Sequence, residues 1–361
     1  MLRLCVSERI LLYFYPAKMD TTKNKHIAVI GAGPAGLAAS ATLAQLGYTV
    51  SLVEEKEQKG GHLLQWDRLF PSQRPANDVL DFLEKDVQAG IRFIAPASPE
   101  KFEKTDIFKI SLNTGEAVNA DAILLATGFD TFEASRKEEY GHGIYDHVIT
   151  SVELEKWFKE KQSLIGAGNQ GPKRIGLVHC VGSRDEKVGN LHCSRVCCVT
   201  AVKQAIELKE KFPQSEVYCF YMDLRMFGSG YEELYKESQE KYGIQFIRGR
   251  LSEAFENPDS SVLVKVEDTL AGKPLKMSLD LLVLMVGMTP SKGTTRMAQL
   301  LGLGLNSNGF LASGDEHTLI HDSTVAGVFH CGTCRAPKSL EDTLTDARSA
   351  AIRIDQYLRG N

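Results

Sequence analysis

The chain has 361 residues, a formal net charge of -4 and a hydrophobic share of 43%. This length allows two ordinary domains or one large one, and the hydrophobic share can fill a sizeable core. No run of lysine or arginine stands out, so the sequence lacks the electrostatic footprint of nucleic-acid binding, and small molecules and proteins are the expected partners. The eight cysteines favour free thiols in a reducing cytoplasm, because a chain of this length rarely needs disulfides.

The first 25 residues are expected to form an N-terminal extension. The apolar run over residues 10–15 is shorter than a signal peptide or a transmembrane segment requires. Met19 directly precedes a polar stretch and the first predicted strand. Residues 1–18 are therefore interpreted as an upstream start or a disordered extension.

A strand over His26–Ile30, the glycine turn GAGPAG and a helix over 37–46 are predicted in this order. This is the order that a dinucleotide-binding fingerprint requires. Gly31 permits the tight turn, Gly33 lets the backbone approach a pyrophosphate, and Gly36 lets the helix pack on the strand. The phosphates would then rest on the N-terminus of the helix.

A second strand, over residues 48–53, ends at Glu54 and Glu55. These residues place a carboxylate about 20 residues beyond the turn, where it can bind ribose hydroxyls. The context of strand, turn and helix makes the glycine motif specific for a dinucleotide. It does not by itself separate NAD from FAD.

A second match to GxGxxG, at residues 166–171, is interpreted as a loop between domains. It follows a predicted helix over 152–163 and precedes Pro172 and a predicted strand over 174–179. A nucleotide-binding turn needs the reverse order, with the strand first and the helix second.

Four cysteines, Cys180, Cys193, Cys197 and Cys198, are predicted to bind an iron-sulfur cluster, because four thiolates are the usual ligand set of a cubane. Adjacent cysteines cannot point the same way within a helix or a strand, so Cys197 and Cys198 fit the start of the helix predicted over 199–211. The free amides and the helix dipole at such a start favour the thiolate. Zinc, which usually takes pairs of cysteines two to four residues apart, and unligated cysteines are the alternatives.

These cysteines begin at the turn after the strand over 174–179, where a pyridine-nucleotide domain would carry its glycine turn. Binding of NADH or NADPH is therefore not expected. The residues that follow are predicted to alternate between helices and strands, as in a second α/β domain. The predicted elements are a helix over 199–211, a strand over 216–221, a helix over 229–242, a strand over 244–247 and strands near 261–267 and 280–286.

Three segments resemble the two-dinucleotide-domain flavoproteins related to thioredoxin reductase: GAGPAG with Glu54, residues 121–128, and the tail 327–333 with a helix from about Leu340. The resemblance implies an α/β fold with two Rossmann-like dinucleotide-binding domains. It also implies FAD, in a discontinuous domain whose last strand and helix come from the C-terminus. Thr333 departs from the pattern, because the relatives usually carry Asp there, and a hydroxyl brings no charge.

The same resemblance implies a division of the chain and a set of FAD-binding residues. The loop with His62, Gln65, Trp66 and Asp67 packs by the flavin in such relatives. The expected divisions are an extension (1–25), the first part of the FAD domain (26–150), the second Rossmann-like domain with the cluster (151–290) and the second part of the FAD domain (291–361). The expected FAD-binding residues are Gly31, Gly33, Pro34, Ala35, Gly36, Glu54, Glu55, Gly61, Thr127, Gly128, Gly332 and Thr333.

The segments around the cysteines, residues 180–185 and 193–198, resemble the A-type subunits of heterodisulfide reductases and their bacterial relatives in sulfur metabolism. Residues 221–228 and 246–250 extend the similarity, which covers about 26–360. The resemblance implies FAD and a [4Fe-4S] cluster on the four cysteines. The ferredoxin-type inserts of larger archaeal members, with repeated CxxCxxCxxxC runs, do not occur here. The chain therefore resembles the short bacterial forms, from either a sulfur-oxidising heterodisulfide-reductase-like complex or a quinone-interacting oxidoreductase.

Two further features of the sequence have open interpretations. In the family that the chain resembles, a lysine at the position of Lys203 lies near the flavin N5, where a cation would stabilise an anionic reduced flavin. A solvated helix lysine is the alternative. Cys331 and Cys334 form a CxxC that is interpreted as structural or incidental, with a redox or ligand role as the alternative.

The resemblance thus implies an FAD-dependent oxidoreductase. We expect an electron-transfer subunit in which FAD exchanges two electrons with a donor and passes them singly through the cluster. The expected partners are B- and C-type subunits or electron carriers, and a homodimer is considered as well. An NAD(P)H-dependent disulfide reductase that uses Cys331 and Cys334, and a scaffold whose cofactors only hold a complex together, remain the alternatives.

Overall fold

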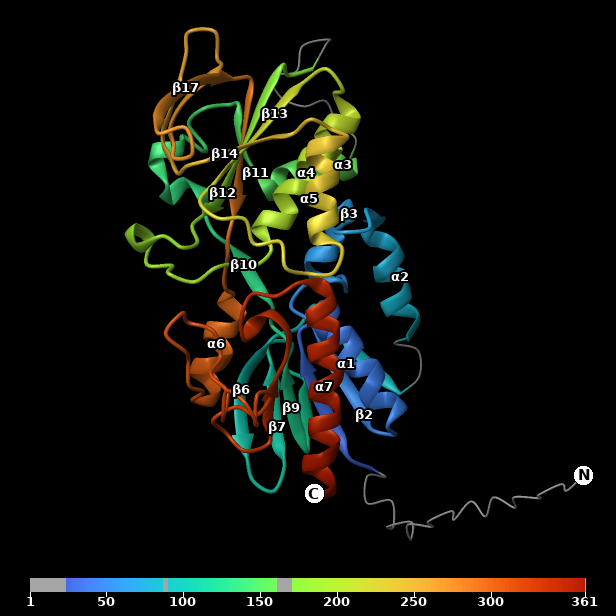
Figure 1. Ribbon diagram of the computed structural model, residues 1–361. Helices are drawn as coiled ribbons and strands as arrows, with labels where there is room; N and C mark the ends of the chain where they lie inside the picture. Colours follow the sequence, from blue (N-terminus) through green and yellow to red (C-terminus); the bar gives the residue numbers. More distant parts are fainter. Residues whose placement is uncertain (1–23, 87–89, 161–170, 361) are drawn as a thin grey trace, which may run out of the picture.

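The computed structural model describes residues 24–86, 90–160 and 171–360 (Figure 1). The predicted extension up to residue 23 and most of the second glycine motif, residues 166–170, lie outside these ranges. Two five-stranded sheets organise the described chain, one in the lower and one in the upper half of Figure 1.

The first sheet has the strand order β20-β9-β1-β2-β5, and all of its pairings are parallel. Most of its residues are buried aliphatic side chains, as is typical of a parallel sheet covered on both faces. Strand β20 comes from the C-terminal tail and pairs with β9, so the first domain is discontinuous in sequence, as predicted. The strands are β1 (His26–Ile30), β2 (Thr49–Val53), β5 (Ile91–Ile94), β9 (Ala122–Leu125) and β20 (Val328–His330).

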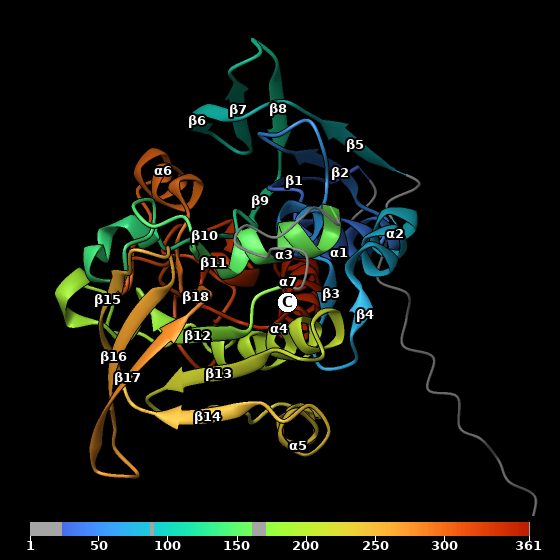
Figure 2. The same ribbon diagram turned by 90° about the horizontal axis from the view of Figure 1, so that it is seen from above.

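Different layers cover the two faces of this sheet. Ile27 and Val29 belong to the core beneath the helices, whereas Ala28 and Ile30 belong to the core on the opposite face. Figure 2 shows the antiparallel β6-β7-β8 sheet on one side of the first sheet, with α1 and α7 on the other. The covering elements are α1 (Pro34–Gln45), α2 (Ala76–Asp86), α7 (Leu340–Arg359), β6 (Pro99–Lys104), β7 (Phe108–Leu112), β8 (Ala117–Ala120) and α6 (Lys292–Leu301).

The second sheet repeats this plan with the parallel strand order β11-β18-β12-β13-β14. Helices pack on one face, and a second three-stranded antiparallel sheet, β15-β16-β17, packs on the other. Two Rossmann-like units are therefore present, as predicted. The elements are β11 (Val148–Thr150), α3 (Ser151–Glu160), β12 (Arg174–Val181), α4 (Cys197–Lys211), β13 (Glu216–Tyr221), α5 (Tyr231–Glu240), β14 (Gln245–Arg248), β15 (Leu251–Glu256), β16 (Val262–Asp268), β17 (Lys273–Leu279) and β18 (Leu281–Val286).

A two-stranded antiparallel ribbon joins the two units. Its strands are β10 (Phe129–Thr131) and β19 (Met288–Pro290), and Figure 1 shows β10 between the two sheets. Strand β11 pairs with β18 of the second sheet, although the expected division leaves residues 148–150 in the first part. The remaining short elements are β3 (Arg68–Leu69), β4 (Arg74–Pro75) and the 3-10 helices Gly61–Leu64, Ala134–Arg136, Glu138–Tyr140, Glu186–Val188 and Gly332–Cys334.

Two helices begin earlier than the sequence predicts. Helix α1 begins at Pro34, because a proline at the first helical position already has a helical φ and loses no hydrogen bond. Helix α4 begins at Cys197, so both adjacent cysteines lie in its first turn. None of the helices in the described ranges combines the length with the apolar character needed to traverse a bilayer.

Candidate functional site

The three glycines of the first turn have different tasks. Gly31 has a φ of 105°, and a Cβ atom there would lie 2.4 Å from the carbonyl oxygen of Ala126. A Cβ atom on Gly36 would lie 1.8 Å from the carbonyl oxygen of Gly31, so this glycine permits the close contact between helix and turn. A Cβ atom on Gly33 would have no neighbour within 4 Å. Gly33 therefore leaves open space at the N-terminus of α1.

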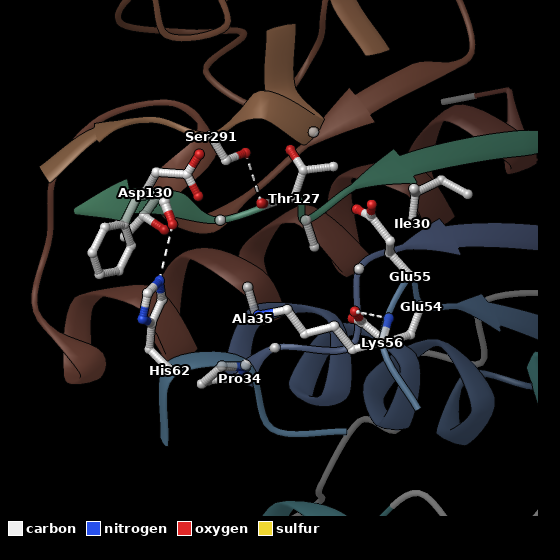
Figure 3. A pocket seen from close by; sticks show the side chains of 18 of the residues that line it. Ile30, Pro34, Ala35, Glu54, Glu55, Lys56, His62, Thr127, Asp130 and Ser291 are labelled. Atoms are coloured by element: carbon white, nitrogen blue, oxygen red, sulfur yellow. Dashed lines mark hydrogen bonds between the residues drawn. The ribbon is translucent and has the colours of Figure 1, made fainter. Parts of the chain in front are cut away.

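That open space belongs to a cavity of about 600 Å³ at the carboxyl ends of β1, β2 and β9 (Figure 3). Parallel sheets bind ligands at such an edge. Gly36 and Gly332 are not among its lining residues, since both serve packing: a Cβ on Gly332 would lie 2.8 Å from the Cβ of Ala35. The predicted residues that line the cavity are Gly31, Gly33, Pro34, Ala35, Glu54, Glu55, Gly61, Thr127, Gly128 and Thr333.

The two glutamates after β2 differ in their contacts. Glu54 accepts hydrogen bonds from the backbone amide of Ala32 at 2.6 Å and from that of Lys56 at 3.0 Å. Both of its carboxylate oxygens thus stabilise the turn. Figure 3 shows the carboxylate of the exposed Glu55 directed toward the cavity, on the side of Thr127. Of the two, Glu55 is better placed to bind a ribose.

Sequence reasoning missed the N-terminus of α6 as part of this cavity. Ser291 caps the helix by accepting a hydrogen bond from the amide of Thr294, and its hydroxyl donates to the carbonyl of Thr127. The hydroxyls of Thr127 and Thr294 lie 2.7 Å apart, and Asp130 accepts from the amide of Lys292. The only local sign of a helix start was Ser291 as a possible N-cap, and Gly293 in the first turn weakens the prediction of a helix there.

A half-buried carboxylate that the sequence did not single out organises the C-terminal tail. Asp346 accepts from the amide of Gly332 at 2.6 Å, from Arg335 at 2.6 Å and from Lys338 at 3.0 Å. Burial alone would raise the pKa of Asp346, but the charges of Lys338 and Arg335 outweigh it and lower the pKa. Asp346 therefore fixes the turn that presents Thr333 to the cavity.

The predicted ligand cysteines gather where β12 ends and α4 begins. Cys180, Cys197 and Cys198 are all buried, and the sulfurs of Cys180 and Cys197 lie 4.0 Å apart. Cys198 contacts the carbonyl of Asp223 at 3.6 Å, whereas the half-buried Cys193 accepts from the amide of Arg195 at 3.3 Å. As placed, no three or more His, Cys, Asp or Glu side chains in the described ranges form a ligand set for a metal ion. The cluster ligation therefore stays a prediction.

The electrostatics of these thiols favour ionisation at two of them. Contact with Cys197 and then with His179 lowers the pKa of Cys198 to about 4, and contact with Cys197 lowers that of Cys180 to about 7. Burial would lower the pKa of His179, but the thiols of Cys198 and Cys219 raise it to about 10. Thiolates at a helix N-terminus are the state in which cysteine binds metal, so the donor set fits an iron-sulfur cluster chemically.

The loop between β12 and α4 is held by packing and by ion pairs. It runs over residues 182–196, and a Cβ on Gly182 would overlap the ring of Phe132, so this glycine serves packing. Asp185 fixes the loop: it is buried and pairs with Lys137 at 2.8 Å and with Arg250 at 2.6 Å. That the thiols take the place of a pyridine-nucleotide site stays a prediction.

A second cavity, of about 420 Å³, adjoins the first and reaches the thiols. His62, Trp66, Phe129 and Met288 line both cavities, and Cys197 lies on the wall of the second. The imidazole of His62 stacks on Phe129 with the ring centroids 4.2 Å apart. Lys338 and Leu340 also line both cavities, so the shared wall is half aromatic.

Lys203 lies on the second cavity and is not among the lining residues of the first. Its side chain is 2% exposed; the ammonium donates to the carbonyl of Arg68 at 3.2 Å and to Glu155, and it forms an ion pair with Glu207 at 3.0 Å. Burial lowers its pKa, but the two carboxylates raise it overall, and burial raises the pKa of Glu207 to about 7. The alternative of a solvated helix lysine is wrong. A role beside the flavin stays a prediction.

Comparison with known proteins identifies the family. Residues 25–351 match the sequence profile described as pyridine nucleotide-disulphide oxidoreductase. The second A-type iron-sulfur subunit of the CoB-CoM heterodisulfide reductase of Methanopyrus kandleri is 30% identical over 442 aligned residues, which cover 98% of this chain and 67% of that protein. The chain belongs to the pyridine nucleotide-disulphide oxidoreductases, and among them to the family of heterodisulfide reductase A-type subunits. As a member it is an FAD-dependent oxidoreductase.

The relatives of this pyridine nucleotide-disulphide oxidoreductase are longer than the chain itself. The A-type subunit of a heterodisulfide, ferredoxin reductase of Methanothermobacter thermautotrophicus is 42% identical over 241 residues, which cover 65% of this chain and 37% of that protein. The chain thus spans about a third to two thirds of the relatives' length. The 442-residue alignment exceeds the 361 residues of the chain, so the Methanopyrus kandleri protein carries inserted residues that this chain lacks.

Solved structures of other proteins show the same fold. Thioredoxin reductase of Lactococcus lactis superposes with a TM-score of 0.65 at 17% identity, covering 93% of this chain and all of that one. Bacillithiol disulfide reductase of Bacillus cereus gives a TM-score of 0.62 at 15% identity, covering 93% and 99%. At these identities the likeness concerns the fold, with its two dinucleotide-binding units.

The CxxC of this oxidoreductase is placed unfavourably for dithiol chemistry. Both cysteines are fully buried, and Cys331 belongs to the core on the helical face of the first sheet while Cys334 belongs to the core on the opposite face. Burial raises the pKa of Cys334 to about 11 and that of Cys331 well above its usual value. Both thiols are free, and the structure favours the structural interpretation of the pair.

Proposed function

We propose that this chain is an electron-transfer iron-sulfur flavoprotein, with FAD in the first cavity and a [4Fe-4S] cluster on Cys180, Cys193, Cys197 and Cys198. The observation that carries the proposal is the shared wall between the two cavities. One cavity begins at the dinucleotide turn, and the other ends at Cys197. A cofactor in the first cavity would therefore border the wall that this cavity shares with the cavity of Cys197.

The residues of the first cavity would bind the parts of FAD in a definite order. The free amides at the start of α1 and the open space at Gly33 suit the pyrophosphate, and Glu55 suits the ribose. The stacked pair of His62 and Phe129 would border the ring system, near Thr333. When bound, FAD supplies the conversion between two-electron and one-electron transfer.

The thiols would hold the cluster at the start of α4, where the helix dipole and the free amides stabilise negative charge. Cys180 and Cys197 are already in contact, and Cys193 would join them from the loop that Asp185 fixes. The lowered pKa of Cys198 supports a thiolate ligand there. Zinc and unligated cysteines remain the alternatives.

For Lys203 we propose a positioning role beside the flavin. Its ammonium already contacts the carbonyl of Arg68 and the carboxylates of Glu155 and Glu207, so it would act through its charge from the wall of the second cavity. Glu155 and Glu207 balance that charge. A potentiometric titration of the flavin in Lys203→Met and Lys203→Arg tests whether the charge of Lys203 sets the flavin potential.

We further propose that the chain works as the flavoprotein subunit of a heterodisulfide-reductase-like complex in sulfur metabolism, in a reducing cytoplasm with other subunits or electron carriers. The names of its relatives, which are subunits of heterodisulfide reductases, support this assignment. The expected domain divisions at residues 25, 150 and 290 belong to the same proposal.

Anaerobic purification with counts of iron, sulfide and flavin tests the proposal. The wild-type chain should carry about four irons and one FAD, and Cys198→Ala should lose the iron while it keeps the flavin. Cys219→Ala is the matched control, because Cys219 is also buried beside His179 but is not a proposed ligand. An iron content below about one per anaerobic wild-type chain would refute the cluster.

A further inference from the structure

The second cavity has the size and the lining of a site for a small organic molecule. Its volume is about 420 Å³, and such sites commonly measure about 300–1,000 Å³. The proposed function assigns no molecule to this cavity. Aromatic side chains, whose faces favour a planar ring as ligand, are prominent on its wall: Trp66, Phe70, Phe82, Phe129 and Tyr231.

The charges on this wall favour an uncharged ligand. Each lysine and arginine among its described lining residues pairs with a carboxylate, so none is left to attract an anion. The exposed Glu341 adds a negative charge, which disfavours an anion further. The pairs are Arg68 with Glu210, Arg74 with Asp78, Lys203 with Glu155, and Lys338 with Asp346.

Gln204 gives the same wall an unpaired hydrogen-bond acceptor. Its side chain is completely buried on α4 and lines the second cavity. The Nε2 group donates to the carbonyl of Ser151 at 2.8 Å and to the carboxylate of Glu155 at 2.7 Å. The Oε1 atom has no hydrogen-bond partner among the described residues. A buried acceptor without a partner costs free energy, which a donor in the cavity would recover.

The contacts of Gln204 fix the orientation of its amide. A backbone carbonyl and a carboxylate both accept hydrogen bonds, so exchanging the oxygen and nitrogen of the amide would set acceptor against acceptor at Ser151 and at Glu155. The free side of the amide is therefore its oxygen. Only an N–H or O–H group of a ligand can pair with it.

We propose that the second cavity binds an uncharged planar aromatic compound that carries an N–H or O–H group, and that this group donates a hydrogen bond to Oε1 of Gln204. The aromatic side chains hold the ring. Phe82, which is 53% exposed on the wall, loses contact with water when the ring binds. Binding makes and breaks no covalent bond. The site needs neither FAD nor a cluster, so it stands or falls independently of the proposed function.

Isothermal titration calorimetry of the purified full-length chain with indole and benzofuran tests the proposal. The two probes have nearly the same shape, but only indole has an N–H group. The wild-type chain should bind indole at least about tenfold more tightly than benzofuran, because benzofuran leaves Oε1 of Gln204 unpaired. Gln204→Met removes the acceptor at similar side-chain volume, so its affinities for the two probes should lie within about threefold of each other.

Two phenylalanine variants locate the binding site. Phe82→Ser should weaken the binding of both probes, because it removes an aromatic face from the wall. Phe255→Ser is the matched control: Phe255 is 40% exposed on β15 and does not line the cavity, so this variant should bind both probes as the wild type does. If Gln204→Met does not fold, as circular dichroism would show, the wild-type ratio and this pair of variants still decide.

Several results would overturn the proposal. Equal affinities of the wild-type chain for indole and benzofuran, or an unchanged ratio in folded Gln204→Met, would refute the role of Gln204. No binding of indole, or equal losses in Phe82→Ser and Phe255→Ser, would refute the site, and tighter binding of indole-2-carboxylate than of indole would refute an uncharged ligand. Loss of indole binding on titration with FAD would assign the cavity to the flavin ring instead. A chain that binds indole as expected but carries no flavin or iron would refute the proposed function and leave this site standing.

Discussion

Gly33 and Gly36 are three residues apart in one motif, yet alanine at each should have a different effect. At Gly36 the added Cβ would overlap the carbonyl oxygen of Gly31, 1.8 Å away. The Cβ is attached to the backbone of α1 and the oxygen belongs to the backbone of the turn after β1, so neither can rotate away and the helix must move. At Gly33 the added Cβ would meet nothing within 4 Å, because it would point into the cavity.

The magnitudes follow from these distances. Alanine at Gly36, inside α1, gains about 1 kcal/mol of helix propensity, but overpacking against backbone costs about 3 kcal/mol. We therefore expect the free energy of unfolding to fall by about 2 kcal/mol. The melting temperature of the flavin-free chain should then fall by about 4–8 °C. Gly33→Ala replaces a favourable N-cap residue with a poorer one, so its unfolding free energy should fall by no more than about 1 kcal/mol.

For FAD binding we expect a direct effect at Gly33, where the added methyl group enters the cavity. Gly33→Ala should bind FAD at least about tenfold more weakly, a loss of about 1.4 kcal/mol, because a methyl group occupies the approach of the pyrophosphate. Thermal unfolding of the flavin-free chains and titration with FAD followed by flavin fluorescence measure the two quantities. The reasoning is refuted if Gly33→Ala destabilises the flavin-free chain as much as Gly36→Ala does, or if it binds FAD as tightly as wild type.

Three further outcomes are expected. The pKa of Glu207 is about 7 in the folded chain against 4.5 in the unfolded chain, so its contribution to stability is complete below about pH 4.5 and is lost as the pH rises through 7. In urea unfolding, the free energy of unfolding should therefore fall less between about pH 5 and 7.5 in Glu207→Gln than in wild type. An equal fall in both proteins would contradict the assignment. Asp185→Asn weakens the pair with Lys137 and frees the cysteine loop, so iron should be lost faster to a chelator while flavin content stays constant. The double variant Cys331→Ser and Cys334→Ser should keep its flavin and its photoreduction rate, and loss of reduction without unfolding would restore the dithiol hypothesis.

The sequence was most informative where chemistry depends on local spacing. The glycine turn with its flanking strand and helix predicted the first nucleotide site, and the structure places ten of the twelve predicted residues on one cavity. The tail resembling a flavoprotein tail predicted that a C-terminal strand completes the first sheet, and β20 does so. Gly36 and Gly332 fell outside the cavity because a glycine motif does not distinguish backbone packing from ligand approach.

Other parts of the site depend on contacts between residues far apart in the chain. Ser291 donates to the carbonyl of Thr127, 164 residues away in the chain. Asp346 accepts from the amide of Gly332, although the sequence of its helix predicts only a solvent-exposed position there. The burial of Lys203 between Glu155 and Glu207 could not be predicted from helical periodicity, because the facing carboxylate of Glu155 comes from another helix.

The sequence by itself determined the alternation of strands and helices, the dinucleotide turn and the set of four clustered cysteines, because each is written in residues close along the chain. Only the tertiary structure decided that the two cavities share a wall, that Cys331 and Cys334 lie in different cores, and that Arg184 and Arg248 meet at Asp223 beside Cys198. The physical reason is that burial, ion pairing and cavity shape arise where distant segments meet, and local residue spacing does not encode those meetings.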